Sequence, residues 1–431
     1  MKNIFAHIPS SRALRETAIT YGGLVLGGAS LFLLNVLMGR WLDPAQYGGF
    51  SIALVALNTL AELSDFGLNA ALIRFASYYS AHGETGKLHL LMKMVWIWRV
   101  RLAAILTVSG IAFSRLIAQH VFNAPELGQL LALSFLGIGG VIFLGFVTTY
   151  LQATRHYTRA ACLQISKGLL RLALVGGFYM AGFSSLRPAM VLYAAVPWIL
   201  FTASARFLPR GFLAADVRDA DAVAIRRQLG HFSFWIALWS FAAVVSGRVE
   251  QVFVSGLMGL SAVATYSVAY QFIQFYSVGV QAISAVTGPR IGAVRTRAEL
   301  AVVSRRAFRW LSALVVLLIP FVFVSARLIP IFFGTKYAGA MPVYIVLSLG
   351  YLFYFLATPF SFVISAYNRT YLYAVCAVIQ FGITVALNYL LIPRMGIQGA
   401  SAAFAIGSLY MFAFNAVSAA WLVRYREFSV S

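Results

Sequence analysis

Residues 341–365 read MPVYIVLSLGYLFYFLATPFSFVIS, a stretch that contains no charged residue. A helix needs about 20 apolar residues to cross a bilayer, so this stretch is long enough to span one. The whole chain has the same character: of its 431 residues, 61% are hydrophobic and only 10% are charged, and its mean hydropathy is +0.84. A soluble fold could not cover so much apolar surface with so few charges. The composition therefore excludes a soluble enzyme, a secreted disulfide scaffold and a disordered chain, and it predicts a polytopic membrane protein.

Twelve apolar stretches of this kind are predicted to be transmembrane helices. An isolated strand cannot satisfy its backbone in lipid, and the stretches are about twice as long as a barrel strand. They cover residues 17–39, 49–73, 94–114, 127–150, 161–182, 189–207, 233–254, 262–287, 309–330, 341–365, 371–391 and 398–421. The predicted fold class is an all-α integral membrane protein with about 12 transmembrane helices.

The basic residues set the orientation. With the N-terminus inside, 24 of the 33 Lys and Arg residues, Arg99 among them, are assigned to cytoplasmic segments, six are assigned to outer segments, and Lys167, Arg171 and Arg248 are assigned to spans. Basic residues accumulate on the cytoplasmic side of membrane proteins, so both termini are predicted to be cytoplasmic. The net charge of +21 is thus explained by topology, and no nucleic-acid partner is expected. The first apolar run is too long for the core of a signal peptide and is interpreted as a retained helix.

An internal repeat predicts two homologous halves. A shift of 216 residues places residues 50–53 on residues 266–269, Asn58 on Gln274, and Gln164 on Gln380. The predicted organisation is a six-helix bundle over residues 1–207, a cytoplasmic linker over 208–232 and a second six-helix bundle over 233–431. Repeats of the same orientation are related by an axis along the membrane normal, and two such bundles facing a central cavity form a transporter.

Polar residues within the spans predict the lining of that cavity. In residues 49–73, Asn58, Glu62, Asp65 and Asn69 are spaced by four, three and four positions, which puts them on one helix face. The other candidate lining residues are Gln164, Gln271, Gln274, Gln281, Gln380 and Asn388. Hydrogen bonding between helices is the alternative interpretation of these amides.

The charged residues within spans suggest a binding site for an anion. Ionisable groups are costly in a bilayer and normally face a cavity or one another. Lys167, Arg171 and Arg248 are the candidate substrate-binding cations, because a guanidinium suits bidentate binding of phosphate. Glu62 and Asp65 are candidates for coupling or gating, and an ion pair of either with Lys167 is geometrically feasible. Such a pair would serve as a structural link, as a gate or as a proton-sensitive switch.

Other motifs carry little chemistry. Cys162 and Cys376 have no partner nearby, and the six histidines lack the spacing of metal ligands. We therefore predict no metal, no cofactor and no catalytic residue, and we do not expect an enzyme. Residues 22–23 and 27–28 are glycine pairs, which predict close helix packing.

Four stretches resemble bacterial polysaccharide flippases of the Wzx type, in the multidrug/oligosaccharidyl-lipid/polysaccharide (MOP) exporter superfamily. They are GRWLDPAQYG at 39–48, DFGL at 65–68, IFFGTKYAGA at 331–340 and LNYLLIPRMGIQGA at 387–400. The resemblance implies two six-helix bundles that work by alternating access. The implied substrate is an undecaprenyl-pyrophosphate-linked oligosaccharide, moved from the inner to the outer leaflet of the bacterial cytoplasmic membrane. It leaves open whether the glycan belongs to an O-antigen, a capsule or an exopolysaccharide.

Two other functions are compatible with a polytopic membrane protein. A drug or metabolite antiporter of the same superfamily shares the crossing count, but an exporter of cations would be expected to line its cavity with carboxylates. A polysaccharide polymerase or ligase would be expected to carry a large outer loop with His, Asp or Arg. The expected partners are the lipid-linked oligosaccharide, membrane lipids and other membrane proteins of polysaccharide assembly.

The topology is tested by cysteine labelling in a background that lacks Cys162 and Cys376. With Arg187→Cys, we expect a membrane-impermeant maleimide to react from outside intact cells. With Arg218→Cys, we expect reaction only after permeabilisation, because residue 218 is assigned to the cytoplasm. The reverse pattern would overturn the predicted orientation.

Overall fold

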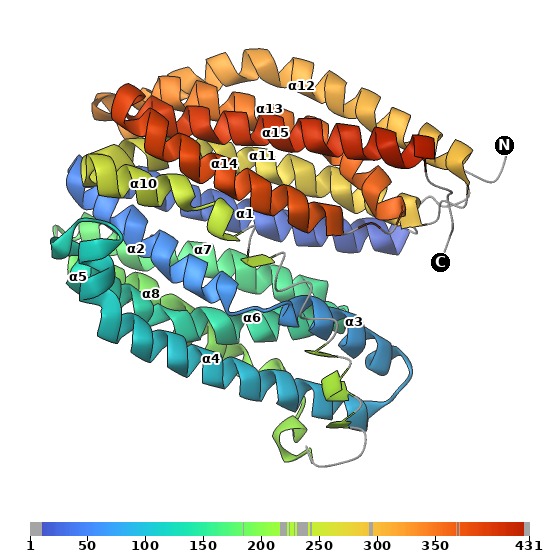
Figure 1. Ribbon diagram of the computed structural model, residues 1–431. Helices are drawn as coiled ribbons and strands as arrows, with labels where there is room; N and C mark the ends of the chain where they lie inside the picture. The colour runs from blue at the N-terminus through green and yellow to red at the C-terminus, as the bar shows by residue number, and fades with distance from the viewer. Residues whose placement is uncertain are drawn as a thin grey trace. The chain divides into compact units, whose positions relative to one another are not determined.

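The computed structural model describes residues 11–183, 185–215, 244–292, 296–367 and 371–425, together with residues 222, 223, 225–227, 229, 230, 240, 241 and 369. In this part of the chain the regular structure consists of helices, without strands (Figure 1). Nine of these helices are long and apolar enough to cross a membrane, and the bent pair α2–α3 makes a tenth. The described residues thus form a multi-pass, all-α membrane protein, and the predicted fold class is confirmed.

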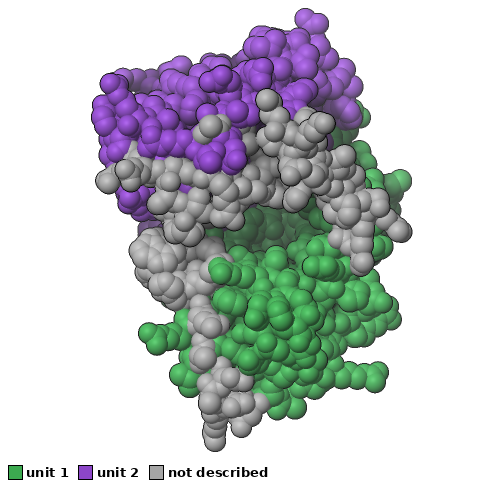
Figure 2. Space-filling view, turned by 90° about the vertical axis from the view of Figure 1, so that its right-hand side faces the viewer, with its two compact units in different colours: residues 1–41, 53–117, 126–240 green, residues 42–52, 118–125, 241–431 purple. Residues whose placement is uncertain are grey.

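The chain divides into two compact units, shown in separate colours in Figure 2. Unit 1 comprises residues 1–41, 53–117 and 126–240, and unit 2 comprises residues 42–52, 118–125 and 241–431. Two short segments of the N-terminal half, 42–52 and 118–125, therefore belong to unit 2. Parts of the predicted linker at 208–232 and of the predicted span 233–254, among them residues 216–221 and 231–239, lie outside the described residues, so the boundary between halves stays a prediction.

Unit 1 contains the first eight helices, apart from the segments just named. The helices are α1 (Ser11–Trp41), α2 (Pro44–Leu63), α3 (Leu68–Ala81), α4 (Thr85–His120), α5 (Gly128–Phe135), α6 (Gly137–Ala153), α7 (Tyr157–Met180) and α8 (Leu186–Ser204). Helix α1 packs along α7, and α6 packs along α8. The predicted single span 49–73 is a broken helix here, because it comprises α2 and α3, which are bent by 46°. The predicted span 127–150 contains α5 and α6, which are separated only at Leu136 and lie within one span over Pro125–Ala153.

Unit 2 is built from the remaining helices. These are α10 (Val249–Met258), α11 (Leu260–Gly292), α12 (Arg297–Phe333), α13 (Ala340–Ala366), α14 (Tyr371–Met395) and α15 (Ile397–Tyr425). Helix α13 packs against α11, α12 and α15, and α14 packs against α15. Prolines occur inside α12, α13 and α14, as transmembrane helices tolerate where neighbouring groups satisfy the freed backbone.

Two of the stretches that resemble the flippase family pack on each other in unit 2. The ring of Tyr47 lies 6.3 Å from that of Phe333 and 5.9 Å from that of Tyr337. The ammonium of Lys336 donates a hydrogen bond of 2.6 Å to the carbonyl of Leu42. The fit extends to Gly48, because a Cβ at this position would lie 1.9 Å from the carbonyl oxygen of Leu260. These stretches therefore include contacts that hold residues 42–52 in unit 2.

The glycines of α1 give the close packing that their spacing predicts. A Cβ on Gly23 would lie 2.7 Å from the Cβ of Ala161, and a Cβ on Gly27 would lie 2.8 Å from the carbonyl oxygen of Gln164. Positions 22 and 28 differ, because a Cβ there would meet nothing within 4 Å. One glycine of each pair thus lets the backbones of α1 and α7 approach each other, as small residues do in membrane helices.

Adjacent glycines give a matched test of this packing. Gly27→Ala should destabilise the protein by about 1–3 kcal/mol, because the added methyl group must push the backbone of α7 away. Gly28→Ala should be neutral or slightly stabilising, because alanine is the better helix former and the position is open. Thermal unfolding in detergent checks both, and equal melting temperatures for the two variants would contradict the packing.

Candidate functional site

The bend between α2 and α3 creates the first polar site in unit 1. Residues 64–67 interrupt the helix, and Phe66 and Gly67 adopt positive φ angles of 43° and 74°. Glycine has no Cβ and adopts such a conformation without strain. The side chain of Asp65 accepts a hydrogen bond of 3.0 Å from the backbone amide of Asn69, and thus supplies a partner to the first turn of α3. The DFGL stretch is therefore the hinge of this broken helix.

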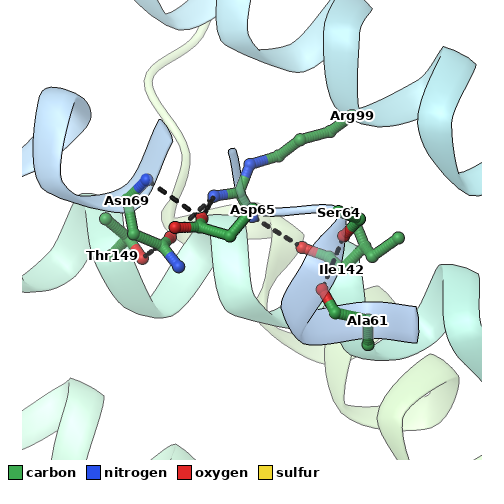
Figure 3. A network of polar contacts seen from close by, with 7 residues as sticks. All are labelled: Ala61, Ser64, Asp65, Asn69, Arg99, Ile142 and Thr149. Carbon is green, nitrogen blue, oxygen red and sulfur yellow. Dashed lines mark hydrogen bonds and ion pairs between the residues drawn. The ribbon is translucent and has the colours of Figure 1, made fainter. Parts of the chain in front are cut away.

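A buried arginine from α4 holds this hinge (Figure 3). Arg99 is only 4% exposed, and its Nη2 lies 3.5 Å from Oδ1 of Asp65. The same Nη2 donates a hydrogen bond of 2.6 Å to Oδ1 of Asn69, and Nη1 donates one of 2.9 Å to the carbonyl of Ile142 in α6. Thr149, also in α6, donates its hydroxyl to Oδ1 of Asn69 at 2.6 Å. The guanidinium thus links the hinge, α4 and α6.

This network changes two interpretations of the sequence. Asp65 is paired with Arg99 and not with Lys167, which was one feasible partner. Arg99 was assigned to a cytoplasmic segment, but it is buried. It lies within the long helix α4 (Thr85–His120), and its side chain packs against the hinge. Glu62, the other coupling candidate, is exposed on α2. The sequence feature that could have predicted the burial of Arg99 is its position within the predicted span 94–114.

Arg171 and Lys167 form the second polar site in unit 1. Arg171 on α7 is 4% exposed, and its guanidinium carbon lies 3.8 Å from the ring centroid of Tyr193 on α8. This geometry is a cation–π contact. The Nε of Arg171 is buried without a hydrogen-bond partner among the described residues. Lys167, one turn earlier on the same helix, is partly buried. The site is therefore cationic, and no acidic residue of the described chain forms an ion pair with it.

Arg248, the third candidate cation, lies in unit 2. It is partly buried at the residue that precedes α10. The structure thus brings Lys167 and Arg171 together on one helix, whereas Arg248 belongs to the other unit.

The candidate lining amides occupy different environments. Asn58 and Asn388 donate their amide groups to backbone carbonyls four residues earlier, Leu54 and Thr384, as expected for polar residues satisfied within a helix. Asn388 is nevertheless fully buried, and its Oδ1 lacks a hydrogen-bond partner in the described structure. The side chains of Gln164, Gln271 and Gln380 are partly buried, Gln274 is exposed, and the side chain of Gln281 lies outside the described residues.

One buried acid is not among the residues singled out from the sequence. Glu250, in the first turn of α10, is 3% exposed, and its Oε1 has no hydrogen-bond partner within the described part of the chain. The neighbouring Gln251 is 6% exposed and has an unpartnered Oε1 by the same criterion. Residues 233–239, 242 and 243 of the predicted span 233–254 lie outside the described residues. A single acid two positions from an arginine carries no pattern that separates a buried position from an interfacial one. No group of three or more His, Cys, Asp or Glu able to hold a metal occurs among the described residues.

With this geometry established, comparison with known proteins identifies the family. The model of the polysaccharide biosynthesis protein family matches residues 14–295, well over half of the chain. The chain belongs to this family. An uncharacterised membrane protein of Methanocaldococcus jannaschii is 22% identical over 407 residues, which cover 89% of this chain and 79% of that protein.

Solved structures show the fold of this polysaccharide biosynthesis protein. An inward-facing multidrug resistance MATE family transporter of the MOP superfamily matches with a TM-score of 0.73 at 14% identity, over 92% of this chain and 94% of that one. The lipid II flippase MurJ, in an inward closed conformation, matches with a TM-score of 0.71 at 14% identity, over 94% of this chain and 87% of that one. A MOP superfamily transporter of Pyrococcus furiosus, described as having a binding pocket of reverse polarity, matches with a TM-score of 0.65 at 14% identity, over 95% of both chains. The chain therefore has the MOP superfamily fold.

The Arg99 network predicts a specific loss of stability. Arg99→Met should lower the free energy of unfolding by about 2–5 kcal/mol, because it leaves Asp65, Asn69 and the Ile142 carbonyl without their shared donor. Arg101→Met, two residues further along α4 and exposed, is the matched control and should have little effect. Chemical unfolding of the purified protein measures both variants. Equal stability of the Arg99 variant and the control would show that the hinge does not depend on the guanidinium.

Proposed function

We propose that this protein is a flippase that moves an undecaprenyl-pyrophosphate-linked oligosaccharide from the inner to the outer leaflet of the bacterial cytoplasmic membrane. The glycan is a repeat unit of an O-antigen, a capsule or an exopolysaccharide, and the movement follows alternating access. Membership of the polysaccharide biosynthesis protein family and the MOP superfamily fold both support this proposal. The protein acts as a transporter and not as an enzyme, with both termini in the cytoplasm.

The observation that carries the substrate class is the unpaired cationic pair on α7. Burying a charge is costly unless a counter-charge or hydrogen-bond partners compensate it. Arg99 has such partners, whereas Arg171 at the same 4% exposure has only the face of Tyr193. An anionic substrate would supply the missing partner, and a pyrophosphate offers several oxygens in the arrangement that a guanidinium binds.

The other candidate residues complete the proposed site. Lys167 adds a second positive charge one turn from Arg171, and Arg248 is a further candidate for the anionic head. The amides of Asn58, Gln164, Gln271, Gln274, Gln281, Gln380 and Asn388 are candidates to bind the sugars. The lipid tail would remain in the bilayer, and other membrane proteins of polysaccharide assembly are the expected partners.

Coupling is proposed for Asp65 and Glu62. Asp65 is the acid at the hinge of the broken α2–α3 span, where its charge is balanced by Arg99. A conformation that separates the two side chains would leave the carboxylate free to take a proton or a sodium ion. Asp65 would then serve both in the hinge and as the gate.

A drug or metabolite antiporter of the same superfamily is the second candidate function. The MATE transporter that shares the fold favours it. The cationic site on α7 argues against it for cationic drugs, because two like charges would repel such a substrate.

Leaflet-resolved detection of lipid-linked oligosaccharide in cells depleted of the protein tests the proposal. We expect the lipid-linked intermediate to accumulate on the cytoplasmic face and surface polysaccharide to fall. Wild-type protein should restore export, whereas Arg171→Gln should leave it at least tenfold lower at normal protein levels, because the buried anion-binding group is lost.

Arg159→Gln is the matched control, since Arg159 lies on the same helix but is exposed. Normal export by the Arg171 variant would remove this residue from the site. An unchanged lipid-linked pool in depleted cells, together with altered tolerance to cationic compounds, would favour the antiporter.

A further inference from the structure

The N-terminal end of α12 presents a cluster of arginines on a surface that faces away from the protein. Arg305, Arg306 and Arg309 are all exposed, and none makes a hydrogen bond or ion pair within the described structure. Successive helix residues are about 100° apart, so these three fall within one 100° sector of the helix. We refer to Arg305, Arg306 and Arg309 as the arginine cluster.

The opposite side of α12 fixes the direction in which the cluster faces. Leu300, Ala307 and Leu311 are buried at 2%, 6% and 1% exposure. Leu300 belongs to a small apolar core with Val363 and Ile364 of α13 and Leu422 of α15. The capping box of Thr296 and Glu299 defines the start of the helix. This end of α12 is therefore a fixed part of unit 2, and its arginine face is the outer face.

The same outer face continues into an apolar stripe further along the helix. Val316, Leu317, Phe323 and Val324 are 65%, 69%, 56% and 60% exposed. In a membrane protein such side chains face lipid and not water. The arginine cluster lies on the prolongation of this stripe, which places it against the surrounding lipid.

The length of the helix places the cluster at the headgroups. Between Arg309 and Arg327, α12 carries no charged residue, and at 1.5 Å per residue this separation is about 27 Å, close to the ~30 Å thickness of the hydrocarbon core. Trp310, 67% exposed, lies next to Arg309, as is typical of aromatic residues at the membrane interface. The arginine cluster thus lies within about two turns of the boundary of the hydrocarbon.

The surrounding charge is almost entirely positive. Glu299 is the only acidic residue in the sequence between 260 and 425, and it is engaged at the helix cap. The helices that pack on α12, namely α11 and α13, contain no acidic residue to compete for the arginines.

We propose that the arginine cluster is a binding site for the headgroups of anionic phospholipids in the leaflet that meets the N-terminal end of α12. Each guanidinium can donate two parallel hydrogen bonds to a phosphodiester, while Trp310 and the apolar stripe contact the glycerol and acyl chains. The inference needs only the membrane placement of α12, so it stands apart from the proposed transport function.

Native mass spectrometry of the protein released from nanodiscs of mixed phosphatidylglycerol and phosphatidylcholine tests the site. We expect wild-type protein to retain phosphatidylglycerol in preference to phosphatidylcholine. The triple variant Arg305→Gln, Arg306→Gln, Arg309→Gln should lose at least tenfold in retained phosphatidylglycerol, since each basic residue near a charged bilayer contributes about fivefold. The variant Arg305→Lys, Arg306→Lys, Arg309→Lys should keep a preference for the anionic lipid.

A second triple variant with the same change in net charge is the control. Arg187, Arg327 and Arg394 are exposed on three different helices, α8, α12 and α14, and form no cluster that could bind one headgroup, so their change to Gln should leave retention within twofold of wild type. Melting temperatures close to wild type show that each variant is folded. Equal loss in both triple variants, no preference for phosphatidylglycerol in wild type, or complete displacement of the lipid by millimolar inorganic phosphate would overturn the proposal.

Discussion

Hydrocarbon offers neither a hydrogen bond nor a counter-charge, and this constraint governs every polar group in the protein. The effect is clearest at the break between α2 and α3, where backbone groups leave the helical pattern within a predicted span. The protein supplies partners internally: the Asp65 carboxylate accepts from the backbone amide of Asn69, and the guanidinium of Arg99 contacts the side chains of Asp65 and Asn69. Side chains of α4 and α6, Arg99 and Thr149, therefore stabilise the hinge. The bend between α2 and α3 thus depends on contacts with both α4 and α6.

Two arginines of equal burial show how this constraint distinguishes structure from function. Arg99 is compensated by a carboxylate, an amide oxygen and a carbonyl, which is what a structural cation in a bilayer requires. Arg171 contacts an aromatic face and is otherwise without a hydrogen-bond partner among the described residues. A buried guanidinium that lacks a partner in every conformation would only destabilise the protein. The contrast between the two sites supports an external partner for Arg171.

The sequence predicted the parts of the structure that repeat a simple physical rule. Apolar length predicted the helices, and glycine spacing predicted the contact of α1 with α7. The sequence did not reveal that the span 49–73 is broken, because Asp65-Phe66-Gly67 interrupts it without a proline and its polar residues fit one helix face. It also left the partner of Asp65 open and did not reveal that Glu250 is buried. Such pairings depend on the rotation of each helix about its axis, which is set by tertiary packing and not by composition. The roles of Lys167, Arg171 and Arg248 remain predictions.

The placement of residues 42–52 in unit 2 has a consequence for biosynthesis. Tyr47 enters the membrane early, but the rings that enclose it, Phe333 and Tyr337, are translated about 290 residues later. At a synthesis rate of about 5–20 residues per second, the segment waits roughly 15–60 s for its neighbours. During that interval the start of α2 contacts lipid or a chaperone at the positions that the rest of unit 2 occupies in the finished protein. The N-terminal half therefore cannot reach its final structure on the ribosome before the C-terminal half has followed it into the bilayer.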